Sequence, residues 1–195
     1  MNKDIINFFI FYNLLTILLN KGDERVKEII MKTMIIYYSE GGNTKQVAKT
    51  LSSQLSADLA EIKDMKLRTG FYGKVSSAVD AFRENKTETI PQKVELEDYG
   101  IVYFGTPTWA NKPAPAIITI IDKCDLQGKD VVLFATMNGS EGRFAIKRMK
   151  EKVESRGARV VEFFTIKTKN KDLTQIREDS EKIAKLLDLS LFTYL

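Results

Sequence analysis

Short apolar runs, separated by longer amphipathic or polar stretches, set the pattern of this chain from residue 33 onward. Most of the runs are rich in β-branched and aromatic residues, which is typical of strands buried in a parallel sheet. The second run alternates only weakly between apolar and polar residues. We expect five strands, at Thr33–Tyr38, Asp58–Ile62, Ile101–Phe104, Val131–Ala135 and Ala158–Ile166.

Between these runs, apolar side chains recur three or four positions apart, which indicates amphipathic helices. The helices are expected at Asn43–Leu55, near Val75–Arg83, from Pro113 and Pro115 to Cys124, at Arg143–Arg156 and at Asp172–Leu187. Strands that alternate with helices predict an α/β domain in which one parallel sheet is covered on both faces. Ligands of such sheets bind beyond the carboxyl ends of the strands, so the loops after the first, third and fourth strands matter most.

The first thirty residues differ from the rest of the chain. The apolar run Ile5–Leu19 is short for a membrane-spanning helix, which needs ~20 mostly apolar residues, and no signal-peptide cleavage site follows it. Met31 and Met34 stand directly before the first expected strand. We therefore interpret residues 1–30 as an apolar extension ahead of the true start, and residues 31–195 as the domain. An amphipathic packing or dimer helix is the second interpretation, and a membrane anchor is the third.

The amino-acid composition limits the kinds of active site that this chain can form. The 195 residues include no histidine and a single cysteine, Cys124, which excludes histidine-dependent triads, histidine-ligated zinc and internal disulfides. With few side chains suited to hard chemistry, the chain is expected to use a bound cofactor, with no catalytic side chain and no metal site of its own. The net charge is +4, but the sequence contains no arginine-rich tract. We therefore interpret the basic residues as part of a solvated surface and expect no nucleic-acid partner.

A glycine-rich turn follows the first expected strand and opens the first helix. Glycines let successive backbone N–H groups converge on one anion, and a helix N-terminus adds about half a positive charge. Hydroxyl and amide side chains add further donors. Taken alone, the turn fits a phosphate site and a plain capped turn equally well. Its candidate cofactor-binding residues are Ser39, Glu40, Gly41, Gly42, Asn43 and Thr44.

This turn, SEGGNT, resembles the S/T-x-x-G-N-T phosphate loop of flavodoxins, which holds the 5′-phosphate of FMN. The resemblance covers about residues 33–188. It implies a flavodoxin-like three-layer sandwich, in which five parallel strands are ordered 2-1-3-4-5 with helices on both faces, and one FMN between the first and third strands. Glu40 departs from the small residue often found in the family, so its side chain must point away from the phosphate.

The segment after the third expected strand, GTPTWA, resembles the G-T/S-P-x-W/Y segment that borders the flavin ring in this family. Backbone groups of Thr108 to Ala110 suit the polar edge of the ring, and Trp109, the only tryptophan, suits stacking on its face. Packing of Trp109 over the edge of the sheet is the alternative. The candidate residues are Thr106, Pro107, Thr108, Trp109 and Ala110.

The segment after the fourth expected strand corresponds to the second flavin loop of the family. Many flavodoxins place a stacking tyrosine there, and this loop has none. Its absence implies a flavin that is more open to a substrate, a nicotinamide or a partner's cofactor. A flexible turn before a helix is the alternative. The candidate residues are Thr136, Met137, Asn138, Gly139 and Ser140.

The sequence therefore predicts a cytoplasmic, FMN-binding electron-transfer protein, either a carrier or an FMN-dependent oxidoreductase. The alternative is an NAD(P)H-dependent FMN reductase acting on quinones or similar acceptors. A flavin-free signalling or binding module is the last alternative, because these loops lack the clustered aspartates of a phospho-receiver. The basic surface suggests an acidic redox partner such as a ferredoxin, or else a small-molecule acceptor. The apolar ends of the chain suggest a homodimer, and no membrane partner is expected.

Overall fold

The computed structural model describes residues 32–65, 87–139 and 142–191, with side chains up to residue 187. These residues belong to one compact unit, Lys32–Leu195. The expected N-terminal extension, the helix expected near residues 75–83, and Ser140 lie outside the described residues.

Five strands form the parallel sheet that the sequence predicts. They run side by side in the order β2-β1-β4-β6-β7, which is the expected order 2-1-3-4-5. Two short strands that the sequence did not predict add antiparallel pairs: β3 (Thr89–Ile90) to β2, and β5 (Lys112–Pro113) to β4. The parallel strands are β1 (Lys32–Tyr38), β2 (Asp58–Asp64), β4 (Tyr99–Trp109), β6 (Asp130–Met137) and β7 (Arg159–Lys167).

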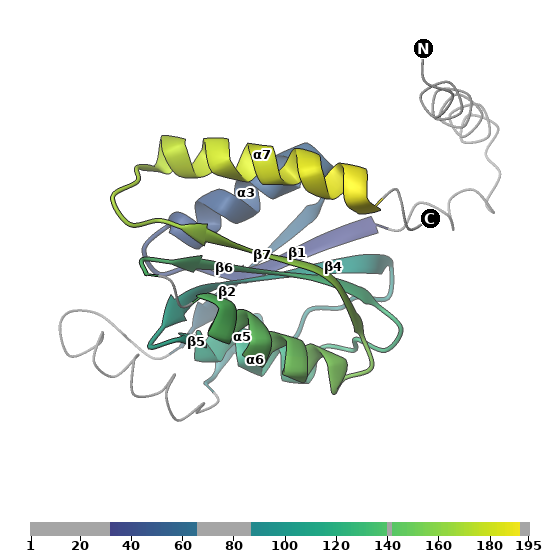
Figure 1. Ribbon diagram of the computed structural model, residues 1–195. Coiled ribbons are helices and arrows are strands. Elements are labelled where there is room, and N and C mark those ends of the chain that lie inside the picture. The colour runs from purple at the N-terminus through teal and green to yellow at the C-terminus, as the bar shows by residue number, and fades with distance from the viewer. Residues whose placement is uncertain (1–31, 66–86, 140–141, 192–195) are drawn as a thin grey trace, which may run out of the picture. The chain divides into compact units, whose positions relative to one another are not determined.

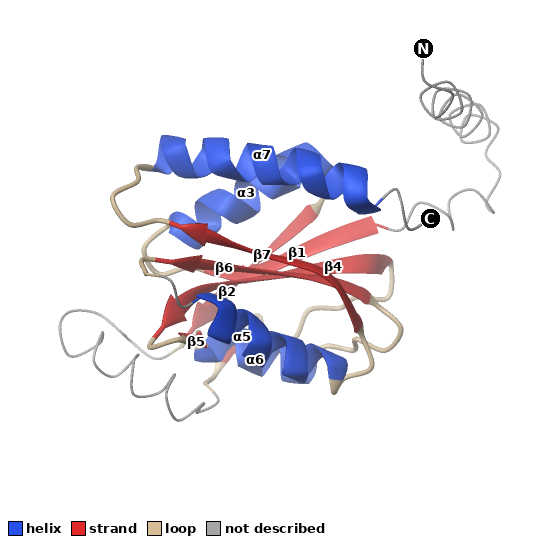
Figure 2. Ribbon diagram, viewed as in Figure 1, coloured by secondary structure: helices blue, strands red, loops and turns tan. Residues whose placement is uncertain are grey.

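Helices cover both faces of this sheet and complete three layers (Figures 1 and 2). Helices α3 (Asn43–Leu55) and α7 (Leu173–Leu191) cover one face. Helices α5 (Pro115–Lys123) and α6 (Gly142–Glu154) cover the other. This arrangement confirms the α/β three-layer prediction. Pro115 occupies the first turn of α5 as expected, because a proline there loses no helical hydrogen bond. Pro113, expected in the same turn, lies instead in β5, where it pairs with Thr108.

The core is divided by the sheet, because neighbouring side chains of a strand point to opposite faces. Ile35 and Tyr103 are fully buried in the cluster under α3 and α7. Ile36 and Phe104 are fully buried in the cluster under α5 and α6. Burial on both faces explains why these strands read as continuous apolar runs in the sequence.

Strand β4 is much longer than the four residues expected from the sequence. It continues from Phe104 to Trp109, so the GTPTW segment is strand and not loop. Gly105, Thr106 and Pro107 pair in register with β6. Gly105 has a packing role, because a Cβ at this position would overlap the ring of Phe134. The pairing with β6 is a long-range contact, which local composition does not reveal.

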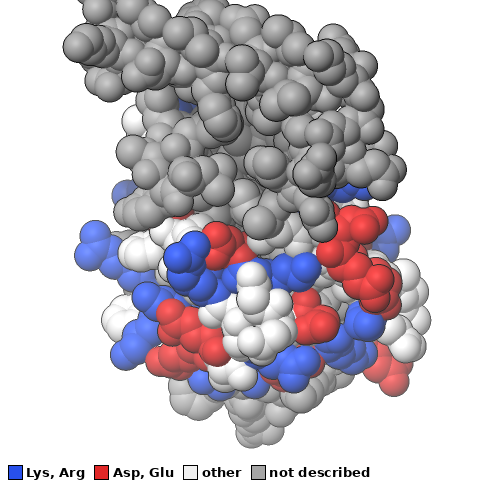
Figure 3. Space-filling model, turned by 90° about the vertical axis from the view of Figure 1, so that its right-hand side faces the viewer, with Lys and Arg blue, Asp and Glu red and all other residues white. Residues whose placement is uncertain are grey.

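At the amino ends of the parallel strands, polar side chains of neighbouring strands form hydrogen bonds with one another. Arg159 donates two hydrogen bonds to the carboxylate of Asp130, each 2.9 Å long. The hydroxyl of Tyr99 donates to Asp58 at 2.7 Å, which raises the pKa of Tyr99 to about 12. Figure 3 faces this side of the molecule, where cationic and anionic side chains are intermixed among the described residues.

Candidate cofactor site

The candidate site lies at the carboxyl edge of the sheet, the edge at which the arrowheads of β6 and β7 end in Figure 1. Strands β1, β4 and β6 are parallel neighbours, so their carboxyl ends meet there. The three segments selected from the sequence follow or end these strands. The fold therefore brings the candidate residues to one edge, although they come from distant parts of the chain.

The turn after β1 leaves the start of α3 without a side-chain cap. Gly42 is the N-cap residue, with a φ of 87°, a conformation that glycine adopts at little cost. No side chain caps the helix, and its first turn contains no acidic residue. A Cβ placed on Gly41 would meet nothing within 4 Å. The first N–H groups of α3 therefore have no capping side chain, and open space lies beside Gly41, as an anion-binding helix start requires.

Ser39 supplies an independent sign of a ligand in this turn. Its Oγ atom is buried and has no hydrogen-bond partner among the described residues. A buried hydroxyl without a partner costs about 1–3 kcal/mol, and such atoms are rare in native proteins. Glu40 in the same turn is exposed, which agrees with a side chain directed away from a phosphate. The residues present fit the phosphate of FMN.

A hydrogen bond joins this turn to the end of β6. Thr44 Oγ1 and Thr136 Oγ1 lie 2.8 Å apart, and both residues are buried. Either hydroxyl can be the donor. When Thr136 donates, the proton of Thr44 is left for another acceptor, such as a phosphate oxygen. The sequence indicated both threonines as candidates, but it gave no sign that they touch.

Lys45, which follows the turn, is already paired with a carboxylate. Lys45 Nζ lies 2.7 Å from Glu61 Oε2, so this cation is held by a carboxylate of β2. Burial, together with the charge of Glu61 and a hydrogen bond to it, raises the pKa of Tyr37 to about 12. Tyr37 therefore stays neutral at physiological pH. An anion in the turn is attracted mainly by backbone N–H groups and hydroxyls.

The residues at the end of β4 divide into a structural and an exposed group. The hydroxyl of Thr106 is fully buried, accepts the N–H of Ala114 at 2.9 Å and donates to the carbonyl of Pro107. This bonding ties β4 to the start of α5. Thr108 Oγ1, in contrast, is buried without a partner among the described residues. It is the second hydroxyl at this edge that a ligand can satisfy.

Trp109 is partly buried and packs against the cluster under α5 and α6. Its ring meets the ring of Tyr38 edge to face, with centroids 5.5 Å apart and planes at 87°. This contact fixes the indole at the carboxyl edge, where the sequence placed it. Stacking of Trp109 on a flavin stays a prediction, because packing and stacking are compatible with a partly buried ring.

A two-residue hairpin turn follows Trp109, which pairs with Lys112 across it. Ala110 and Asn111 have φ angles of 45° and 67°. Two consecutive positive φ values are the pattern of a type I′ turn, which usually contains asparagine or glycine. The sequence missed this hairpin because alanine is unusual in such a turn. The hairpin places Ala110, a predicted cofactor contact, at an exposed tip of the edge.

The segment after β6 is held by β7 and α6. The carbonyl of Met137 accepts the backbone N–H of Thr168 at 2.8 Å, and the Thr168 hydroxyl lies 3.1 Å from Asn138 Oδ1. The N–H of Gly142 donates to the sulfur of Met137 at 3.1 Å. Asn138 and Gly139 are exposed. Thr168, which anchors this segment, carried no signal in the sequence.

Among the described residues, no group of histidine, cysteine, aspartate and glutamate side chains is arranged to hold a metal ion. Within the same ranges, no helix is both long enough and apolar enough to cross a bilayer. The only cysteine, Cys124, is buried at the end of α5, and burial raises the pKa of its thiol. A buried thiol of this kind is a poor nucleophile.

The chain is similar to known proteins in both sequence and fold. Flavodoxin 1 of Salmonella typhimurium and Flavodoxin 1 of Escherichia coli strain K12 are each 27% identical to this chain in an alignment of 139 residues that covers 66% of this chain. The matched region spans 65% of the length of either relative.

Two solved structures share the fold. A protein of Bacteroides uniformis, assigned as a flavoprotein, superposes with a TM-score of 0.68 and 23% identity, over 80% of this chain and 98% of its own. A flavoprotein of Lactobacillus acidophilus in complex with FMN superposes with a TM-score of 0.57 and 24% identity, over 69% of this chain and 93% of its own. The family model described as Flavodoxin matches residues 32–178, which is most of the chain. The protein therefore belongs to the flavodoxin family.

Proposed function

We propose that this protein binds one FMN at the carboxyl edge of its sheet and transfers electrons through it. The observation that carries the proposal is the buried, unpartnered hydroxyl of Ser39 beside the uncapped start of α3. An anion in this turn gives Ser39 its missing partner and accepts the N–H groups of the helix. When bound, FMN supplies one- and two-electron redox chemistry, which the side chains of this chain do not provide.

Each segment of the edge has a separate task in this proposal. Residues 39–44 hold the phosphate, with Thr44 oriented by Thr136. Thr108 and the hairpin at Ala110 provide polar groups for the edge of the flavin ring. Trp109, whose indole is held by Tyr38, provides an aromatic surface beside the flavin. The remaining candidates, including Ser140, are proposed contacts of the second flavin loop.

Titration of the purified full chain with FMN tests the proposal. Flavin fluorescence is expected to be quenched on binding, with one FMN per chain, and the bound flavin is expected to be reduced by dithionite and reoxidised by an added acceptor. Riboflavin, which lacks the phosphate, is expected to bind more weakly. A chain that leaves FMN fluorescence unchanged at concentrations far above its own contradicts the proposal.

A second candidate function is an NAD(P)H-dependent reductase of quinones or similar acceptors. It is favoured by the segment Thr136–Gly139, which contains no aromatic ring to cover a flavin. Steady-state oxidation of NADH or NADPH by the FMN-loaded protein separates the two functions. A carrier shows negligible turnover with either nucleotide, whereas a reductase shows turnover that rises with the acceptor concentration.

The proposed partner of the carrier is an acidic redox protein such as a ferredoxin, because the chain is basic with a net charge of +4. Charge attraction of this kind is screened by salt, so the rate of transfer should fall steeply as ionic strength rises. A rate that is independent of salt contradicts an acidic partner. We also propose a cytoplasmic location and a homodimer, which fractionation and light scattering test.

A further inference from the structure

A pocket of about 410 Å³ lies beside the candidate cofactor site, between the hairpin turn after β4 and the exposed side of α6. The hairpin is the one whose preceding residue is Trp109. The pocket does not include the turn after β1 or the segment after β6. Its lining residues are Ala110, Asn111, Lys112, Phe144, Lys147, Arg148 and Glu151. Pockets that bind small molecules are typically about 300–1,000 Å³.

One wall of this pocket is an aromatic ring. Phe144 is 62% exposed, near the start of α6. A single exposed apolar residue is ordinary on a protein surface, but this one lies in a hollow that also contains charged groups. A ring in that position offers a flat apolar face on which a planar ligand can stack.

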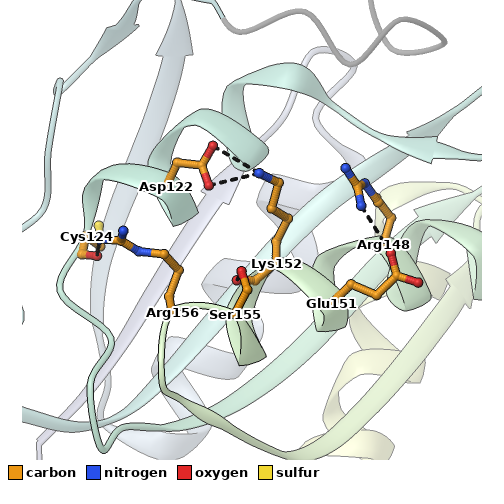
Figure 4. Close-up of polar contacts among 7 residues, drawn as sticks. All are labelled: Asp122, Cys124, Arg148, Glu151, Lys152, Ser155 and Arg156. Atoms are coloured by element: carbon orange, nitrogen blue, oxygen red, sulfur yellow. Dashed lines mark hydrogen bonds and ion pairs between the residues drawn. The ribbon is translucent and has the colours of Figure 1, made fainter.

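The charged groups in the pocket are mainly cationic. Lys112, Lys147 and Arg148 contribute positive charge, against the single carboxylate of Glu151. Arg148 donates to Glu151 at 3.1 Å, which fixes the guanidinium and neutralises that carboxylate (Figure 4). Lys147 forms no ion pair with any acidic side chain in the described ranges. The pocket therefore has an excess of positive charge.

We propose that this pocket binds a small planar aromatic group that carries an anionic charge, and that it thereby holds the molecule bearing this group beside the flavin. The presentation step rests on the proposed FMN site, whereas the binding step rests on the protein residues alone. Two sources share this chemistry: the phosphorylated adenosine part of a nicotinamide dinucleotide, and an anionic quinone. The size of the pocket favours such a ligand over the broad, flatter face that docks a partner protein.

Two probes and two pairs of variants test the inference on the FMN-loaded full chain. The probes are adenosine 2′,5′-bisphosphate and 1,4-naphthoquinone-2-sulfonate, followed by calorimetry at low salt. Phe144→Ala removes the stacking face, and Lys147→Glu reverses the unpaired charge. The matched controls are Phe163→Ala, which removes a ring 50% exposed on β7, and Lys150→Glu, which makes the same charge change on α6 outside the pocket.

We expect at least one probe to bind once per chain, and the preferred probe identifies the source. Lys147→Glu should weaken that binding about tenfold, because it replaces an attraction for the anionic group with a repulsion. Phe144→Ala should weaken it several-fold, because it removes the ring on which the ligand stacks. Both controls should stay within about twofold of the unmodified protein, and the affinity for FMN should not change.

The inference is overturned if neither probe binds, if both probes bind equally well to all four variants, or if the controls lose as much affinity as the pocket variants. Failure of the FMN proposal is seen separately, as a missing flavin signal in the first titration. In that case, the same probe titrations on the flavin-free chain still test the pocket, because protein residues alone form it.

Discussion

The two edges of the sheet differ in how their polar groups are satisfied. At the amino edge, Arg159 pairs with Asp130 through two hydrogen bonds, and Tyr99 pairs with Asp58. At the carboxyl edge, the hydroxyls of Ser39 and Thr108 are buried without partners among the described residues. Both edges belong to the same strands, so the difference does not come from the fold as such. The unsatisfied hydroxyls at the carboxyl edge support the proposal that this edge holds a ligand.

The ends of α5 and α6 repeat the pattern of the amino edge. Asp122 on α5 lies 3.1 Å from the ammonium of Lys152 on α6, and the guanidinium of Arg156 donates to the carbonyl of Cys124 (Figure 4). These contacts join the carboxyl ends of the two helices, at the points from which the chain continues to the next strands. The start of α3, at the opposite edge, has no such side-chain contact capping it.

The largest change in stability is expected at Gly105, where the missing side chain leaves room for a buried ring. Gly105→Ala should lower the free energy of unfolding by about 3 kcal/mol, because its Cβ overlaps the buried ring of Phe134. Gly41→Ala, which meets no atom, should change stability by less than about 0.5 kcal/mol and yet weaken FMN binding. Urea denaturation measures the first quantity. Equal stability of the two variants contradicts the separate roles assigned to these glycines.

A smaller change, this time in FMN affinity, is expected when the hydrogen bond between Thr44 and Thr136 is removed. Thr136→Val should weaken FMN binding about fivefold, or about 1 kcal/mol, because Thr44 loses the partner that orients its hydroxyl. Binding of riboflavin should not change, since that ligand has no phosphate. Thr136→Ser keeps the hydroxyl and serves as the control. An equal loss for both flavins means that Thr136 only supports the fold.

Breaking the ion pair between Asp130 and Arg159 at the amino edge should have a smaller effect on stability and none on FMN affinity. Asp130→Asn should cost no more than about 1 kcal/mol of stability, because the side chain of Arg159 is largely exposed and solvent screens the pair. The affinity for FMN should remain as in the unmodified protein, since the two edges are separated by the length of the strands. An altered affinity would show that the edges are coupled.

At neutral pH the smallest effect is expected from the phenol of Tyr37. Its pKa in the fold is about 12, above the ordinary value of 10, so the folded state keeps a proton that the unfolded state loses. The stability that this group contributes is complete below pH 10 and is lost as the pH rises toward 12. Tyr37→Phe should therefore lose less stability than the unmodified protein across this window. Denaturation at several pH values measures the difference, and parallel curves contradict it.

The features predictable from the sequence are those with local causes. Apolar runs such as Thr33–Tyr38 mark buried strands, and the glycines of residues 39–44 mark the turn that opens α3, whose binding of an anion stays a prediction. The order of the parallel strands followed from the family resemblance that this turn carries. Each of these signals is contained within a few consecutive residues.

The features that the sequence did not reveal depend on distant partners or unusual residues. The extension of β4 through Thr106 is stabilised by pairing with β6, and the bond between Thr44 and Thr136 joins residues 92 positions apart. The hairpin was missed because Ala110 adopts a φ of 45°, which is rare for alanine. Ser39 and Thr108 were candidates because of the motifs that contain them, and the sequence did not show that their hydroxyls are buried without partners among the described residues.

The central claim is that the turn after β1 holds the phosphate of FMN, and Ser39→Ala tests it most directly. Calorimetry with FMN and with riboflavin should show a loss of about ten- to hundredfold for FMN alone, because a hydrogen bond to a charged group contributes about 1.5–3 kcal/mol. Ser155→Ala, which removes an exposed hydroxyl bonded to a carbonyl of α6, should change neither affinity. Unchanged FMN affinity in the Ser39 variant, or equal losses for both flavins, would contradict the account.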